Sequence, residues 1–301
     1  MPTAPIDTGP ILIMTIKNSQ NKVLVTELSL IEVSGADSAE FLHAQFTGNC
    51  TSLIENQMMI TGWCSPKGRV LHLIRLIKSQ NRILLLVPNN QIESIIKRLE
   101  MFVFRSKVTL RNCCESHSII VCHGEGSRKS RVQDGNVTAR FTDNQEWLVV
   151  QTNDQPTIWN SLDNKEGDGE SLKLHDIRYG VPRLPDSLSD QFLPQEINLE
   201  SLGGLSFEKG CYPGQEIIAR VKYRGKIKRT LRRYAINTTN VIESASKLID
   251  DDQNRVGTII ESIVITPDKQ QLLAVVNVDC EQPVIAHLPT VQLTQLPISP
   301  I

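Results

Sequence analysis

The chain has 301 residues, of which 40% are hydrophobic and 22% are charged, and its formal net charge is −1. This balance excludes an intrinsically disordered chain, and the length allows two or three domains with a sizeable core. A net charge near zero gives no reason to expect direct binding of nucleic acid. No apolar run approaches the ~18–20 residues that span a membrane, and the first residues resemble no targeting signal, so we expect a cytoplasmic monomer.

In the first part of the chain, short strands and helices are predicted to alternate. Alternating apolar residues over 22–33 predict a strand that ends in a turn. Asp37 is expected to cap a helix over 38–46, with Glu40 as its capping-box partner. The residues of this helix expected to face inward are Leu42, Ala44 and Phe46.

A hairpin is predicted next, because the apolar runs 58–64 and 69–77 flank the turn Ser65-Pro66-Lys67-Gly68. Helical spacing covers 91–102. Further strands are expected at 83–87, 108–110, 118–122 and 147–150. This irregular order predicts an α+β fold and not a doubly wound one.

The pattern changes at about residue 231, where short strand-like runs separated by turn residues begin. They cover 231–236, 247–249, 256–265, 272–278, 284–288 and 291–296. Several short strands in such a length predict a small antiparallel barrel or sandwich. We therefore divide the chain into a core, residues 1–230, and a C-terminal β-barrel, residues 231–301.

Seven cysteines are scattered along the chain, an odd number that favours reduced thiols over a disulfide framework. Cys113, Cys114 and His117 superficially resemble metal ligands. Adjacent residues of a strand point to opposite faces, however, so we expect no metal site there.

The segment Lys209-Gly210-Cys211-Tyr212-Pro213-Gly214-Gln215-Glu216 has the most unusual composition. Proline followed by glycine predicts a type II turn over 212–215, with Cys211 presented just before it. Lys209 and the start of a following helix would lower the pKa of the thiol, and Glu216 can pair with Arg220 four residues later. The alternative is a glycine-rich turn around an inert, buried cysteine.

This segment resembles the signature Lys-Gly-Cys-Tyr-x-Gly-Gln-Glu of the YgfZ-type folate-binding proteins, also called tRNA-modifying proteins. They are relatives of the glycine-cleavage aminomethyltransferase, the T-protein. The neighbouring segments 192–199 and 202–207 agree with that family, and weaker similarities occur at 33–45, 64–69 and 176–182. The resemblance spans about residues 25–235.

The resemblance implies a three-domain T-protein-like architecture, in which a discontinuous α+β core surrounds a central channel and has a second lobe at roughly 52–115. It implies tetrahydrofolate, or a related folate, in that channel, and iron–sulfur client proteins, including those that methylthiolate tRNA. Cys211 would be the catalytic thiol. The supporting residues would be Lys209, Gly210, Tyr212, Gly214, Gln215, Glu216 and Arg220. The folate contacts would be Gln45, Arg69, Asp176, Arg178, Gln195 and Asn198.

The chain departs from the T-protein at three places. Lys67–Leu73, which matches the stretch with the catalytic aspartate, has no carboxylate, so aminomethyl transfer would lack its acid/base residue. Arg178 stands where the T-protein has a folate-contacting glutamate, and His43-Ala44 stands in place of Gln-Gly. One-carbon transfer on tetrahydrofolate is thus an alternative to the iron–sulfur role, and a non-enzymatic scaffold is another. Whether the chain is an enzyme stays open.

A basic strip follows, in which seven of the twelve residues from 222 to 233 are Lys or Arg and none is acidic. Its basic residues are Lys222, Arg224, Lys226, Lys228, Arg229, Arg232 and Arg233. Such a strip could hold a polyglutamate tail, RNA or the acidic surface of a partner. The alternative is a solvated strand face.

Overall fold

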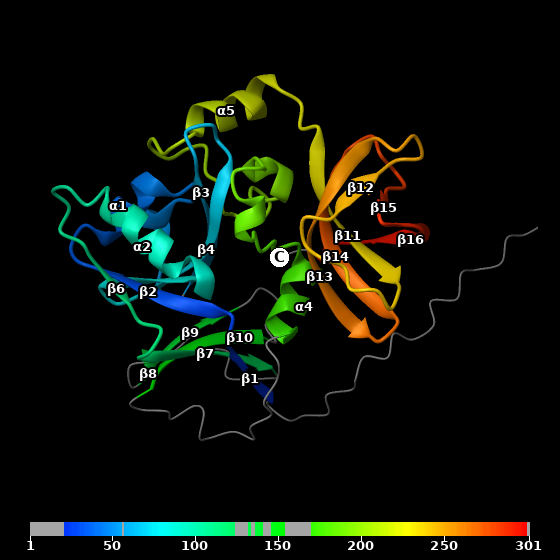
Figure 1. Cartoon of the computed structure of the whole chain (residues 1–301). Coiled ribbons are helices and arrows are strands. Elements are labelled where there is room, and N and C mark those ends of the chain that lie inside the picture. The colour runs from blue at the N-terminus through cyan, green and yellow to red at the C-terminus, as the bar shows by residue number, and fades with distance from the viewer. Residues whose placement is uncertain are drawn as a thin grey trace, which may run out of the picture.

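The computed structural model describes residues 21–55, 57–123, 132–133, 136–140, 146–153 and 170–299. Two β-sheets with helices form the core, and a β-barrel stands beside it, with the segment from α4 to α5 between them (Figure 1). In the part of the chain that is described, no helix is long and apolar enough to cross a membrane.

The first sheet has the strand order β3-β4-β5-β2-β6 and is antiparallel throughout. Its strands are β2 (Leu28–Ser34), β3 (Met58–Cys64), β4 (Val70–Ser79), β5 (Arg82–Pro88) and β6 (Thr109–Asn112). The predicted hairpin is confirmed as β3 and β4. β2 lies between β5 and β6, so the expected lobe 52–115 shares its sheet with a strand from outside that range, and the lobe boundary stays a prediction.

One face of this sheet is covered by α1 (Ser38–Gln45) and α2 (Ile92–Glu100). The strand period of two puts Ile31 in the core with these helices and its neighbour Leu30 in the core on the other face. The predicted helix over 91–102 is confirmed as α2, which a short 3₁₀ turn precedes at Asn89–Gln91.

The second sheet packs on that other face and has the order β1-β7-β10-β9-β8. Its strands are β1 (Asn21–Val25), β7 (His117–His123), β8 (Val132–Gln133), β9 (Asn136–Arg140) and β10 (Glu146–Thr152). The single strand predicted over 22–33 is therefore wrong, because the chain leaves one sheet after β1 and enters the other at β2.

The predicted capping of α1 also needs correction. Asp37 precedes the helix but makes no side-chain cap; its carboxylate accepts a hydrogen bond from the backbone N–H of Lys107, at 2.6 Å, and so joins two loops. Ala44, which was expected inside, is exposed, whereas Leu42 and Phe46 are fully buried.

Between the core and the barrel run α4 (Glu170–Tyr179), two short 3₁₀ turns (Asp186–Leu188 and Pro194–Ile197) and α5 (Gln215–Arg224). Their apolar residues share one core with β4 and with the barrel, through side chains such as Val70, Phe192, Ile218, Leu231 and Val275. This segment therefore joins the two bodies.

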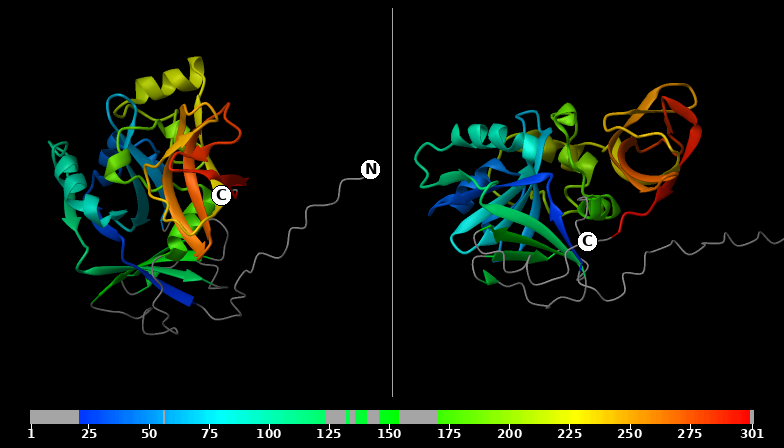
Figure 2. Two further views of the ribbon diagram at one scale, coloured as in Figure 1. Left: turned by 45° about the vertical axis from the view of Figure 1, so that its right-hand side comes forward. Right: turned by 60° about the horizontal axis from the view of Figure 1, so that its bottom comes forward.

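The predicted C-terminal barrel is confirmed: six antiparallel strands close in the order β11-β14-β13-β12-β15-β16 (Figure 2, right). They are β11 (Arg229–Asn237), β12 (Lys247–Ile249), β13 (Arg255–Thr266), β14 (Lys269–Asn277), β15 (Val284–Ile285) and β16 (Leu288–Leu296). The interior is apolar, with fully buried Leu248, Ile259, Leu272, Ala274 and Ile285.

Candidate functional site

The predicted type II turn is present at Tyr212–Gln215. The backbone N–H of Gln215 donates to the carbonyl of Tyr212 at 3.2 Å, and Gly214 has φ 79° and ψ 0°. Those angles are the third-position values of a type II turn, which only glycine adopts at little cost. α5 begins at the next residue, so the turn also sets the direction of the helix.

Gly214 lies directly against the hairpin turn of β3 and β4. A Cβ atom at Gly214 would lie 2.5 Å from both the Cα of Gly68 and the carbonyl oxygen of Ser65. Gly68 is itself left-handed, with φ 72°, and a Cβ there would lie 3.1 Å from the carbonyl oxygen of Gly214. Two turns that are far apart in sequence thus pack backbone to backbone.

Cys211 is exposed, so the alternative of a buried cysteine is wrong, while its reactivity stays a prediction. A Cβ at Gly210 would meet no atom within 4 Å, so the space before the thiol is open. Tyr212, on the other side, is buried in the core that joins the segment to the barrel. The rigid turn therefore anchors its tyrosine inside and leaves its thiol on the surface.

Lys209 anchors the same segment to the end of α1. Its ammonium donates to the carbonyls of His43, Phe46 and Gly48, the last two at 2.6 and 3.0 Å. Burial lowers the pKa of Lys209 to about 8, although the nearby Cys50 acts in the opposite direction. The ammonium is committed to the helix C-terminus, where carbonyl groups attract a cation; the expected effect of Lys209 on Cys211 stays a prediction.

The other motif residues act locally. Gln215 donates through its side chain to the carbonyl of Lys209 at 3.4 Å. Glu216 and Arg220 form the predicted pair, at 3.7 Å, and both side chains are largely exposed. Such a pair contributes at most ~0.5 kcal/mol, so it helps the helix but does not build a site.

Three of the expected folate contacts have other partners or roles in the fold. Arg69 donates to the carbonyl of Gln191, and Gln195 donates to the carbonyl of Ile218 on α5 at 2.8 Å. Asn198 ends a 3₁₀ turn in the left-handed conformation, with φ 59°. These residues brace the connecting segment, and their contact with a folate stays a prediction.

Two further expected folate contacts, Arg178 and Gln45, differ in their exposure to solvent. The side chain of Arg178 is exposed at the end of α4. Gln45 is buried at the end of α1, and its Oε1 atom has no hydrogen bond within the described ranges.

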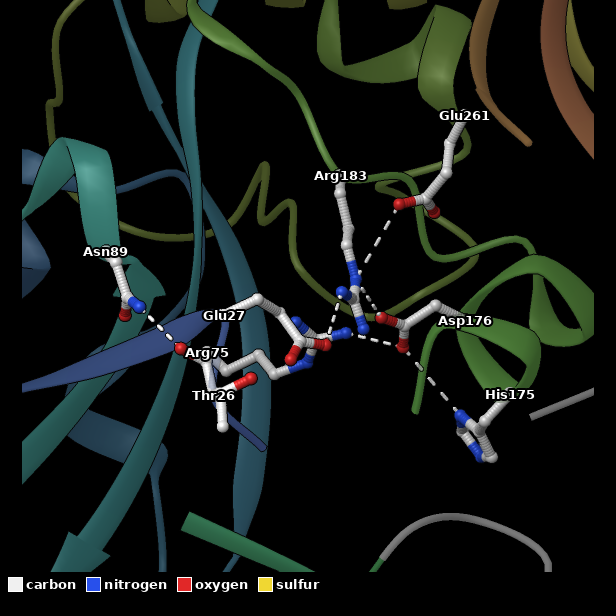
Figure 3. A network of polar contacts seen from close by, with 8 residues as sticks. All are labelled: Thr26, Glu27, Arg75, Asn89, His175, Asp176, Arg183 and Glu261. Atoms are coloured by element: carbon white, nitrogen blue, oxygen red, sulfur yellow. Dashed lines mark hydrogen bonds and ion pairs between the residues drawn. The ribbon is translucent and has the colours of Figure 1, made fainter. Parts of the chain in front are cut away.

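Asp176 lies at the centre of a buried ionic network between the core and the barrel (Figure 3). Its carboxylate accepts from Arg75 at 2.5 Å and from Nε of Arg183 at 2.7 Å. Burial alone would raise the pKa of Asp176, but the two guanidinium groups outweigh it and hold that pKa well below its usual range.

Arg183 connects this network to two further carboxylates. It donates to Glu27 at 2.9 Å, and Glu261 on barrel strand β13 lies 3.8 Å from its Nε atom. Burial raises the pKa of Glu261 to about 8, since Arg183 offsets the loss of solvation only in part. At neutral pH Glu261 is therefore mostly protonated.

A cavity of about 340 Å³ opens beside Arg183 and Glu261. Its walls come from the start of β2, the 3₁₀ turn before α2, α4, the segment after α4 and the barrel. Nη2 of Arg183 and Oε2 of Glu261 are buried, and neither has a hydrogen-bond partner among the residues described. Arg183 and Glu261 both line the cavity, so a donor and an acceptor without partners among the described residues lie beside it.

The cavity and the thiol are two separate sites, since no residue of 209–216 lines the cavity. Of the expected folate contacts, Asp176 reaches the cavity only indirectly, by holding Arg183.

Sequence reasoning missed Arg183 and Glu261. The available signal was a single carboxylate, Glu261, inside the apolar run 256–265.

Comparison with known proteins gives the family. No protein-family model matches the chain. A tRNA-modifying protein YgfZ of Aliivibrio fischeri (strain MJ11) is 30% identical over 218 residues, which cover 69% of this chain and 68% of the relative. The YgfZ protein of Enterobacter sp. (strain 638) is 26% identical over 284 residues, 86% of each chain.

Among solved structures, the glycine cleavage system aminomethyltransferase T from Bartonella henselae matches with a TM-score of 0.73. The match covers 92% of this chain and 85% of that one at 14% identity, which confirms the expected T-protein-like architecture. The chain therefore belongs to the YgfZ family of tRNA-modifying proteins, and its fold is that of the aminomethyltransferase T structure.

Proposed function

We propose that this protein binds a tetrahydrofolate in the cavity between the core and the barrel, and that it supports tRNA modification through the Cys211 thiol. The relatives from Aliivibrio fischeri and Enterobacter are named tRNA-modifying proteins, which supports the second part. The first part is supported by two residues that line the cavity, Arg183 and Glu261, each of which keeps a buried polar atom without a hydrogen-bond partner among the described residues.

These two atoms suit the pyrimidine edge of a pterin ring. That edge carries an amino group and a ring N–H, which donate, next to a carbonyl oxygen, which accepts. Glu261 would accept from the two N–H groups as it ionises, and Arg183 would donate to the carbonyl. Asp176 and Glu27 hold the Arg183 guanidinium in place, so little conformational entropy is lost when the ring binds.

The rest of a folate has room as well. A cavity of about 340 Å³ lies at the lower end of small-molecule sites, which span ~300–1,000 Å³, so it accepts the ring while the tail extends outward. Lys173 in the cavity wall is a suitable partner for a carboxylate of the tail. A bound tetrahydrofolate supplies a carrier of one-carbon units, and the residues of this chain bind and orient it.

Calorimetry with tetrahydrofolate tests the cavity. Glu261→Gln keeps the shape but loses the anionic acceptor, so its dissociation constant should rise ~10–100-fold, the loss expected for a hydrogen bond to a charged group. Glu281→Gln changes an exposed carboxylate of the barrel and serves as the control, with an unchanged constant. No binding by the wild type at millimolar ligand, or equal binding by Glu261→Gln, would refute the cavity site.

For Cys211 we propose a role in maintaining iron–sulfur enzymes, including those that methylthiolate tRNA. An exposed thiol on a rigid turn, with open space before it, is accessible to a partner protein. Because the side chain is exposed, Cys211→Ser should fold normally and still fail to complement a cell that lacks the protein. Cys114→Ser removes the other exposed cysteine of the described part and should complement fully.

Full complementation by Cys211→Ser would refute the proposed role of the thiol. Aminomethyl transfer is the weaker alternative, because Lys67–Leu73 supplies no carboxylate. Formation of methylene-tetrahydrofolate from an aminomethyl donor by the purified protein would restore that alternative.

A further inference from the structure

α5 lies on the outside of the molecule, at the top of Figure 1, where it crosses from the core to the barrel. Of its ten residues only Ile218 is buried. A helix of this length is ~15 Å long, so it presents a continuous exposed surface between Cys211, just before its N-terminus, and the basic strip that begins in its last turn.

Four of the seven cations in the basic strip are bound within the fold. Lys222 pairs with Glu200, and Arg229 pairs with Glu196 at 2.8 Å. Arg232 donates to the carbonyls of Val278 and Cys280, and Arg233 donates to the side chain of Gln271. These side chains fasten β11 and α5 to their neighbours.

Arg224, Lys226 and Lys228 are different. All three are exposed, and within the described ranges none has an ion pair. Tyr223 and Ile227 alternate with them and are 70% and 39% exposed. This surface, residues 223–228, thus combines two apolar side chains with three cations that have no ion pair among the described residues. Such a composition is typical of a surface that binds an anionic protein surface.

The same surface contacts the segment that carries the thiol. The ring of Tyr223 meets the ring of Phe207 edge-on, with centroids 6.0 Å apart, and the Lys222 ammonium lies 5.3 Å from the Phe207 centroid. Phe207 stands four residues before Cys211. The chain from Phe207 to Cys211 therefore runs back along α5, and a ligand on 223–228 lies roughly one helix length from the thiol.

We infer that an acidic segment of a partner protein docks on residues 223–228 and is thereby held within reach of Cys211. The inference rests on the proposed role of Cys211. A protein is favoured over RNA because this surface exposes a single aromatic ring, Tyr223, which provides no stacking platform for successive bases.

Binding is tested by fluorescence anisotropy with a fluorescein-labelled oligoglutamate peptide. The variant R224E/K226E/K228E should raise the dissociation constant by about tenfold or more, since each exposed ion pair contributes ~0.5 kcal/mol. The control K97E/R105E/K247E makes the same change in net charge at scattered exposed positions and should bind as the wild type does. Added salt should weaken wild-type binding.

Three results would overturn the inference: no binding of the peptide by the wild type, an equal loss in both triple variants, or tighter binding of a single-stranded RNA of equal charge that the 223–228 variant abolishes. The last would make the surface a nucleic-acid site. Cys211→Ser should leave peptide binding unchanged, so a failure of the thiol proposal is distinguished from a failure of the docking surface.

Reach to the thiol is tested by a thiol–disulfide exchange in a Cys114→Ser background. The oligoglutamate peptide carries a terminal cysteine blocked as its 2-thiopyridyl disulfide; the Cys211 thiolate attacks the peptide sulfur, a new S–S bond forms, and 2-thiopyridone leaves with the electron pair. Docking should make this reaction faster than with a neutral peptide by roughly tenfold or more. R224E/K226E/K228E should remove the acceleration; equal rates for both peptides with the wild type would contradict it.

Discussion

Replacing Gly214 with alanine perturbs the contact between the two turns that positions Cys211. The substitution has two costs. A left-handed φ of 79° costs an alanine ~1–2 kcal/mol, and the new Cβ would lie 2.5 Å from the backbone of Gly68 and of Ser65. Neither neighbour is a side chain that can rotate away, so a turn must shift, which adds the ~1–3 kcal/mol typical of overpacking.

Substitutions at two other glycines measure the cost of the left-handed φ separately from the cost of the close backbone contact. Gly203 is also left-handed, with φ 70°, but a Cβ there meets nothing within 4 Å, so Gly203→Ala should lose only the ~1–2 kcal/mol of strain. Gly210 has neither a left-handed φ nor a close neighbour, so Gly210→Ala should stay within ~0.5 kcal/mol of the wild type. For Gly214→Ala the expected loss is ~2–5 kcal/mol.

Urea unfolding followed by intrinsic fluorescence measures all three free energies of unfolding. The expected order of loss is Gly214→Ala above Gly203→Ala above Gly210→Ala. A loss for Gly214→Ala no larger than that for Gly203→Ala would refute the backbone contact between the two turns. Loss of stability without loss of thiol reactivity would show that the contact does not position Cys211.

Further perturbations test the anchors and the buried network. Because burial raises the pKa of Glu261 from 4.5 to about 8, the folded chain keeps a proton that the unfolded chain releases; the free energy of unfolding should fall as pH rises between these values, and Glu261→Gln should flatten that slope in urea titrations across this range. Lys209→Met leaves the carbonyls at the end of α1 without their donor and should cost ~1–3 kcal/mol in the same assay, whereas a loss below ~0.5 kcal/mol would contradict the anchor. Thr47→Val removes the 2.6 Å hydrogen bond to the carbonyl of Gly204, and should destabilise by ~1–3 kcal/mol and raise amide exchange over 204–211.

Features decided by short-range chemistry could be read from the sequence. Proline and glycine at adjacent positions predicted the turn at 212–215, and the paired apolar runs predicted the β3–β4 hairpin and the strands of the barrel. For the turn, the hairpin and the barrel strands, the geometry depends on φ preferences and on hydrophobic spacing within a few residues, which the local sequence contains. The family and its fold were implied by the resemblance that the Cys211 motif and the segments around it carry.

Tertiary structure decided which groups meet. Lys209 stands near Cys211 in the sequence, yet its ammonium binds carbonyls some 160 positions away. A buried ammonium needs hydrogen-bond acceptors, and the fold places these carbonyls beside it. Arg183 and Glu261 come from the connecting segment and a barrel strand, and nothing local marks them as neighbours. Their meeting beside a cavity, and the raised pKa of Glu261, follow from burial that only the packed core and barrel create.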